Sequence, residues 1–113
     1  MRQVWLLRDG DVLASTEVAE CLGDRARGLY GQSAQAGALL LLRTRSVHTA
    51  GAPFPVDAAF LDGALTVLAT VRLSPWRVAL PRRGARNVLA SPAGSFERWG
   101  LNLGDRLEIR ETS

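Results

Sequence analysis

His48 and Asp57 are the two residues of this sequence that are best suited to do chemistry. His48 is the only histidine, and a neutral imidazole can accept or donate a proton near neutral pH. Asp57 lies in an apolar stretch, where a carboxylate is costly to bury unless it gains hydrogen bonds or a cationic partner. A small enzyme in which Asp57 orients His48 is therefore one hypothesis for this chain.

The motifs that accompany most such pairs in enzymes are missing from this sequence. It has no nucleophile elbow, no phosphate loop and no paired carboxylates. Asp57 also has a plain structural interpretation, in which it accepts backbone N–H bonds from the proline-containing loop and fixes the shape of that loop. Its functional interpretation is that it orients His48 or holds a ligand-binding arginine. We therefore favour a non-catalytic binding or accessory module over an enzyme. Its predicted site combines the 48–57 loop with two residues beyond it: His48, Thr49, Pro55, Asp57, Trp76 and Arg77.

A basic segment follows at residues 72–86, where no acidic residue interrupts the arginines. Guanidinium groups match the geometry of phosphate and carboxylate, so this segment is a candidate anion contact. Trp76 could stack on a base, but no nucleic-acid motif is present, and a solvated loop face is the plainer alternative. All 14 basic residues are arginines, which a GC-rich coding sequence would also explain. The candidate anion contacts are Arg72, Arg82, Arg83 and Arg86.

Cysteine and histidine content argues against a metal centre. Cys21 is the only cysteine, so no internal disulfide can form, and no Cys/His cluster has metal-ligand spacing. We expect Cys21 to be a packing residue, and we expect no metal or cofactor. A small molecule or an anion remains the possible ligand, and the oligomeric state stays open.

The chain has 113 residues, of which 47% are hydrophobic and 22% charged. This is the size and composition of one globular domain, which we expect to span residues 1–113. The apolar run at 38–42 is far too short to cross a bilayer. Arg8 and Asp9 interrupt the apolar N-terminal stretch before a signal-type segment develops, so we expect no membrane association and a cytoplasmic location.

Strand patterns dominate the first half of the chain. Residues 2–8 and 12–19 read as two strands, joined by a tight turn at Asp9 and Gly10. A short helix is expected at 22–30, where apolar residues recur with helical spacing. A buried strand follows at 38–42. Pro53 and Pro55 divide the stretch at 46–62, because proline is poorly tolerated inside a central strand.

In the second half, Asp62 and Gly63 mark a hairpin, followed by an alternating strand at 65–73. Its inward residues are Leu65, Val67, Ala69, Val71 and Leu73. A loop at 74–84 and a strand at 87–90 come next. Ser91 and Pro92 are typical of the N-cap and first position of a helix that contains Phe96 and Trp99 and ends at Gly100. A last strand at 106–110 points Leu107 and Ile109 inward. The pattern predicts a mainly β fold, either a small antiparallel barrel or a jelly-roll-like sandwich, with two short helices.

Several local motifs resemble successive blocks of the bacterial and archaeal family catalogued as domain of unknown function 192. They are DRARGL at 24–29, GALL at 37–40, VHT at 47–49, FPVDAAFLD at 54–62, PAG at 92–94 and LGD at 103–105. The resemblance covers about residues 10–111 and implies a small jelly-roll-like fold without an established activity, cofactor or catalytic residue. The chain departs from the family pattern at Ala50 and Ala52, where bulky aromatic and methionine residues are common, and at Tyr30, where methionine is common.

Overall fold

The computed structural model describes residues 2–19, 38–48 and 54–111 of the chain. These residues form nine strands and one short helix. The elements are β1 (Arg2–Arg8), β2 (Asp11–Ala19), β3 (Ala38–Leu41), β4 (Val47–His48), β5 (Val56–Leu61), β6 (Val67–Leu73), β7 (Val78–Ala79), β8 (Asn87–Pro92), α3 (Ser95–Trp99) and β9 (Leu107–Glu111). The mainly β class is thus confirmed. The helix expected at 22–30 lies outside the described residues, as do Cys21, Thr49, Ala50 and Ala52.

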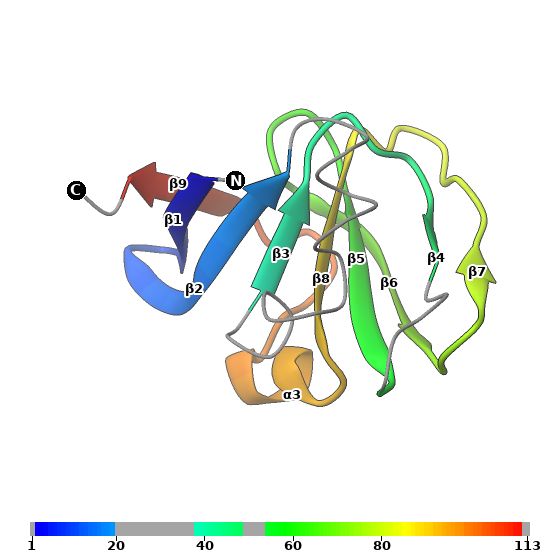
Figure 1. The fold of residues 1–113 in the computed structure, drawn as a ribbon. Helices are drawn as coiled ribbons and strands as arrows, with labels where there is room; N and C mark the ends of the chain where they lie inside the picture. Colours follow the sequence, from blue (N-terminus) through cyan, green and yellow to red (C-terminus); the bar gives the residue numbers. More distant parts are fainter. Residues whose placement is uncertain (1, 20–37, 49–53, 112–113) are drawn as a thin grey trace.

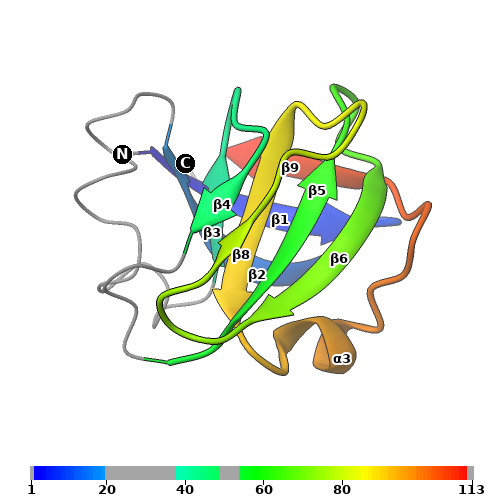
Figure 2. The same cartoon turned by 90° about the vertical axis from the view of Figure 1, so that its right-hand side faces the viewer.

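Seven strands make one mixed sheet in the order β6-β5-β8-β3-β2-β1-β9, and β4 pairs with β7 in a separate two-stranded sheet. The large sheet curls, so that β1 and β9 pass behind β5, β6 and β8 (Figure 2). Its two end strands do not pair along their length, and the contact between them is an isolated bridge between Thr66 and Arg106 with a few backbone hydrogen bonds around it. The expected closed antiparallel barrel or jelly roll is not confirmed. β2 and β3 pair in parallel, which needs a crossover of about a dozen residues or more, and the 20–37 segment is long enough to supply it.

The first hairpin forms as predicted. β1 and β2 are antiparallel, with Arg8 opposite Asp11. Asp9 and Gly10 both have positive φ, of 52° and 84°. A two-residue turn of this kind twists in the sense that the flanking strands require, which explains the preference for Asp-Gly at this position.

Strand β5 lies at the centre of the packing, because all of its residues are buried. Val56, Ala58 and Phe60 join the apolar cluster on one face of the sheet. Ala59 and Leu61 join the cluster on the other face, between the two halves of the curled sheet. Strand alternation puts Asp57 on this second face, at the end of the layer where α3 is located (Figure 1).

Burial alternates along β6 as predicted, with Val67 and Leu73 buried and Thr70 and Arg72 exposed. The prediction that the apolar residues share one face is wrong, because a register shift between Phe60 and Leu61 places Val67 in the cluster between the sheet halves, whereas Leu73 packs on the other face. The strand begins two residues later than predicted. Leu65 has a left-handed φ of 66° and so belongs to the turn after Asp62 rather than to the strand. The predicted place of Leu65 in the strand is therefore wrong, although its side chain packs against the apolar cluster as expected.

The start of the second helix was also wrongly predicted. Ser91 and Pro92 belong to β8, where they pair with Asp57 and Val56 of β5. The helix begins after Gly94, whose φ of 98° turns the chain. Cross-strand pairing therefore overrides the local capping signal of Ser-Pro, and proline is accepted because it ends the strand. The predicted end at Gly100 is confirmed, since Gly100 is the left-handed C-cap.

Candidate functional site

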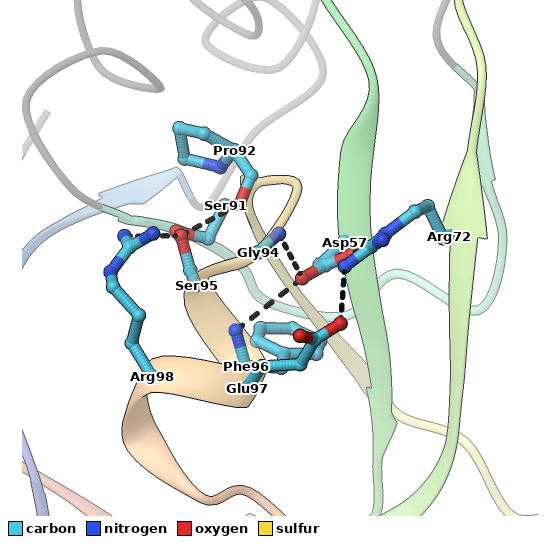
Figure 3. Close-up of polar contacts among 9 residues, drawn as sticks. All are labelled: Asp57, Arg72, Ser91, Pro92, Gly94, Ser95, Phe96, Glu97 and Arg98. Carbon is cyan, nitrogen blue, oxygen red and sulfur yellow. Dashed lines mark hydrogen bonds and ion pairs between the residues drawn. The ribbon is translucent and has the colours of Figure 1, made fainter.

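Asp57 is a buried carboxylate with three hydrogen-bond donors. Its residue is 3% exposed, so the predicted burial is confirmed. Oδ2 accepts the backbone N–H of Gly94 at 2.9 Å and that of Phe96 at 3.3 Å. Oδ1 accepts Nε of Arg72 at 2.9 Å (Figure 3). Gly94 has no side chain to cap α3, and Asp57 supplies the missing acceptor from the neighbouring strand.

Arg72 lies directly opposite Asp57 in the antiparallel pair of β5 and β6. Its Nη2 also donates to Oε1 of Glu97, at 3.1 Å. The hydrogen bond that Arg72 donates to Asp57, with the charge of that carboxylate, raises the pKa of Arg72 above its ordinary value, and Glu97 adds to the effect. The side chain of Arg72 is nevertheless 51% exposed. A buried acid thus fixes the position of a cation that still faces solvent.

A pocket of about 540 Å³ opens beside this ion pair, between the β5–β6 pair and α3. Its size falls within the usual range for small-molecule sites. Its lining is mixed, with charged groups, a hydroxyl, an amide and apolar side chains. The lining residues are Asp57, Thr70, Val71, Arg72, Phe96, Glu97, Gly100, Leu101 and Asn102.

Two serines secure the start of α3 beneath this pocket. The buried hydroxyl of Ser91 donates to Oγ of Ser95 at 2.9 Å, and Ser95 donates to the carbonyl of Pro92 at 2.6 Å. Nη2 of Arg98 donates to the same Ser95 oxygen at 3.1 Å (Figure 3). These bonds hold the chain that presents the Gly94 and Phe96 amides to Asp57.

Arg8 of β1 secures the other end of α3. Its guanidinium donates to the carbonyls of Trp99 and Gly100, at 2.6 and 2.9 Å. It also pairs with Asp105 at 3.1 Å. Leu101 and Asn102, which follow in the chain, line the pocket, so Arg8 helps to fix that wall.

The structure separates most residues of the predicted binding site from Asp57. His48 lies in β4, where it pairs with Val78 of β7, whereas the neighbours of β5 are β6 and β8. Trp76 and Arg77 precede Val78 and are exposed. His48, Trp76 and Arg77 thus lie near one another along the β4–β7 pair, away from the pocket beside Asp57.

Pro55 stays near Asp57, and its carbonyl accepts the backbone N–H of Ala93 at 3.0 Å. The backbone donors to Asp57 are Gly94 and Phe96. Asp57 is therefore bonded to the segment that begins α3, and not to the proline-containing loop before β5 as predicted. Pocket residues from that region, such as Glu97 and Asn102, were missed by sequence reasoning. The available signal was the PAG block at 92–94, which stood out only as part of the family resemblance.

The four candidate anion contacts lie in different places. Arg72 faces the pocket described above, and the guanidinium of Arg82 lies 5.6 Å from the ring centroid of Phe60. Arg83 is exposed in the loop before β8. Arg86 lines a second pocket with Arg43 and Arg45. The linear basic segment therefore contributes to several surfaces.

Within the described part of the chain, no three His, Cys, Asp or Glu side chains are grouped to hold a metal ion. The described residues also include no helix that is long and apolar enough to cross a membrane.

The fold and this site define a small β-sheet domain with a polar pocket at one end of its curled sheet. The chain belongs to the family described as Uncharacterized ACR, domain of unknown function 192, whose model matches residues 5–109. The resemblance seen in its motifs is thereby confirmed.

Similar proteins occur in archaea and bacteria. The UPF0127 protein of Pyrococcus furiosus is 36% identical over 73 residues, which are 62% of this chain and 63% of that protein. The UPF0127 protein of Pyrococcus abyssi is 34% identical over 53 residues, which are 47% of this chain and 45% of that protein. The matched region thus spans less than two thirds of these curated relatives.

Two crystal structures share the fold. One is of a protein from Sinorhizobium meliloti that is provisionally named a transcription regulator, with a TM-score of 0.75 and 26% identity. The comparison covers 95% of this chain and 92% of that one. The other is of a protein of unknown function from Novosphingobium aromaticivorans, with a TM-score of 0.72 and 20% identity, covering 94% of this chain and 83% of that one.

Proposed function

We propose that this protein is a non-catalytic binding module that holds a small organic acid in the pocket beside Asp57 and Arg72. The observation that carries the proposal is the buried Asp57 carboxylate, which fixes the half-exposed Arg72 guanidinium at the pocket wall. An arginine oriented in advance binds a carboxylate with less loss of side-chain entropy than a mobile one.

The geometry of Arg72 supports an acidic ligand. Nε of Arg72 donates its hydrogen bond to Asp57, and Glu97 accepts a hydrogen bond only from Nη2. The side chain of Glu97 is 79% exposed, and exposed ion pairs of this kind contribute little stability. A ligand carboxylate can displace Glu97 and accept both terminal N–H groups of Arg72 in the bidentate arrangement that arginine favours.

The remaining lining supports a ligand that also has an apolar part. Val71, Phe96 and Leu101 supply apolar surface, and Thr70 and Asn102 supply polar groups that can orient the ligand. Apolar surface combined with a few convergent polar groups is typical of small-molecule sites, and this pocket is on the polar side of that range.

Binding fits this site better than catalysis. Both oxygens of Asp57 already accept hydrogen bonds from the protein. A general base needs to reach the proton that it removes, whereas this carboxylate is committed to holding Arg72 and the start of α3.

The test is a titration of the ¹⁵N-labelled protein with acetate, butyrate and benzoate, followed by amide NMR shifts. We expect shifts at residues 70–72 and 96–102, with the tightest binding for benzoate. Arg72→Gln should abolish the shifts, and Glu97→Gln should strengthen binding by removing the competing carboxylate. Arg110→Gln is the matched control, because Arg110 is an exposed arginine on β9. Equal affinity of the Arg72→Gln and Arg110→Gln variants would contradict the proposal.

A further inference from the structure

A second pocket, of about 370 Å³, lies among three arginines at the other end of β5 and β8. The described residues that line it are Arg43, Arg45, Gly63, Arg86 and Asn87. We call it the Arg43 pocket. It shares no lining residue with the pocket beside Asp57.

Three separate segments bring these residues together. Arg43 and Arg45 follow β3, Gly63 belongs to the turn between β5 and β6, and Arg86 directly precedes β8. The backbone N–H of Thr44 donates to the carbonyl of Arg86 at 2.9 Å, and that of Arg86 donates to Leu61 at 2.8 Å. The arginines are thus attached to a hydrogen-bonded frame.

Asn87 completes this frame from a buried position. It is 8% exposed, and its Oδ1 accepts the backbone N–H of Arg43 at 3.1 Å. Its Nδ2 donates to the carbonyl of Asp62 at 3.1 Å. One amide side chain therefore links the turn after β3 to the hairpin that contains Gly63.

The described lining of the Arg43 pocket is cationic. It includes three guanidinium groups and no carboxylate. Asp62 is next to Gly63, but its Oδ1 accepts the backbone N–H groups of Ala64 and Thr66. Among the described residues, no ion pair joins Arg43, Arg45 or Arg86 to an acid, so three arginines share one pocket without a described counter-charge.

The backbone of Arg43 shapes the turn that carries Arg43 and Arg45. Its φ is 55°, a left-handed conformation that is uncommon for a residue with a long side chain and is easily adopted by glycine. The conformation turns the chain so that Arg43 and Arg45 both line the pocket.

We propose that the Arg43 pocket binds a phosphate group through Arg43, Arg45 and Arg86. Three guanidinium groups around one pocket can give a phosphate several charge-assisted, bidentate hydrogen bonds. The volume is at the lower end of the range for ligand sites, which fits a small phosphorylated molecule better than a long strand. Free phosphate and a phosphorylated small molecule both present this group, and the experiment below distinguishes them.

The experiment titrates the ¹⁵N-labelled protein with inorganic phosphate, phenyl phosphate and a ten-nucleotide oligothymidylate. We expect inorganic phosphate and phenyl phosphate to shift the amides of residues 43–45 and 86–87, with an affinity that falls as salt is raised. The triple variant R43Q/R45Q/R86Q should weaken phenyl phosphate binding by about tenfold or more. Arg110→Gln and Arg72→Gln should bind as the wild type does, which separates this site from the organic-acid pocket.

Arg43→Gly provides a variant that tests the site without risk to the fold. Glycine adopts this φ freely, so the melting temperature should rise while phenyl phosphate binds more weakly. A fall in melting temperature with unchanged binding would overturn the role of Arg43. Absence of shifts at residues 43–45 and 86–87 with inorganic phosphate and phenyl phosphate would overturn the proposal, and binding of oligothymidylate alone would replace it with a nucleic-acid contact.

Discussion

Asp57 and Arg72 face each other across β5 and β6, and Nε of Arg72 lies 2.9 Å from Oδ1 of Asp57. One partner is buried and the other is half exposed. The Asp57 carboxylate therefore has two roles. It caps the start of α3 by accepting the N–H groups of Gly94 and Phe96, and it orients Arg72 beside the pocket. Loss of the acid should affect both stability and binding.

Replacing Asp57 should destabilise the protein in proportion to the bonds that are lost. Asp57→Asn keeps the shape and removes the charge, so it should lower the free energy of unfolding by about 1–3 kcal/mol. Asp57→Ala should cost more, because it leaves two backbone N–H groups without an acceptor. Urea denaturation provides the measurement. Glu108→Gln, on an exposed carboxylate of β9, is the control, and equal stability of all three variants would show that Asp57 anchors nothing.

Glycine at position 94 should be required for the entry into α3. Its φ is 98°, so Gly94→Ala should lower stability by about 1–2 kcal/mol through backbone strain. Gly63→Ala is the matched control, because an added Cβ there meets no atom within 4 Å. Thermal unfolding of both variants measures the difference. Equal melting temperatures would contradict the left-handed conformation at Gly94.

The two faces of β6 should respond differently to a charge. Val67 is 2% exposed and packs between the sheet halves, so Val67→Asp should cost more than about 3 kcal/mol by burying an unpaired carboxylate. Leu68, the next residue, is 36% exposed, and Leu68→Asp should change stability by less than about 1 kcal/mol. Denaturant titration of both proteins checks this. A reversed order would mean that the strand is turned the other way.

The contribution of Arg72 to stability should not vary with pH between 6 and 9. Its pKa is raised in the folded protein, chiefly by its hydrogen bond with Asp57. For a base with a raised pKa, the stabilisation is fully present below the unfolded pKa and is lost as pH rises through the folded one. Both values lie far above this window.

Arg72→Gln should therefore lower the free energy of unfolding equally at pH 6 and at pH 9, as measured by urea denaturation. A difference that grows between these two pH values would mean that another titrating group depends on Arg72.

Sequence reasoning succeeded where the determining interactions are local. The Asp9-Gly10 turn and the alternating burial along β6 follow from backbone and side-chain rules over a few residues. The register shift that turns Val67 to the other face did not follow, because it depends on pairing with β5. Burial of Asp57 also followed, because apolar residues surround it on both sides. The partners of Asp57 did not follow, since its pairing with Arg72 depends on strand register and its bonds to Gly94 and Phe96 depend on how β8 lies beside β5.

The same limit explains the errors. Ser91 has the local signature of an N-cap, yet pairing with β5 keeps it in the strand. The basic segment at 72–86 appeared to be one surface because its arginines are close in sequence. Arg43 and Arg45 were overlooked because their turn is brought to β8 by contacts between residues distant in sequence, namely the bonds of Thr44 with Arg86 and of Arg43 with Asn87.

The pairing of β1 with β9, in which Val4 lies opposite Glu111, bears on how the chain reaches its native state. Contacts between residues so distant in sequence carry a large loop-closure entropy and are associated with slow folding. During synthesis, β1 and β2 emerge early, whereas the strand that covers the outer side of β1 emerges last. Until then β1 presents unpaired N–H and C=O groups, the kind of edge that recruits strands of other chains. The nascent chain is therefore most exposed to aggregation before residues 107–111 are in place.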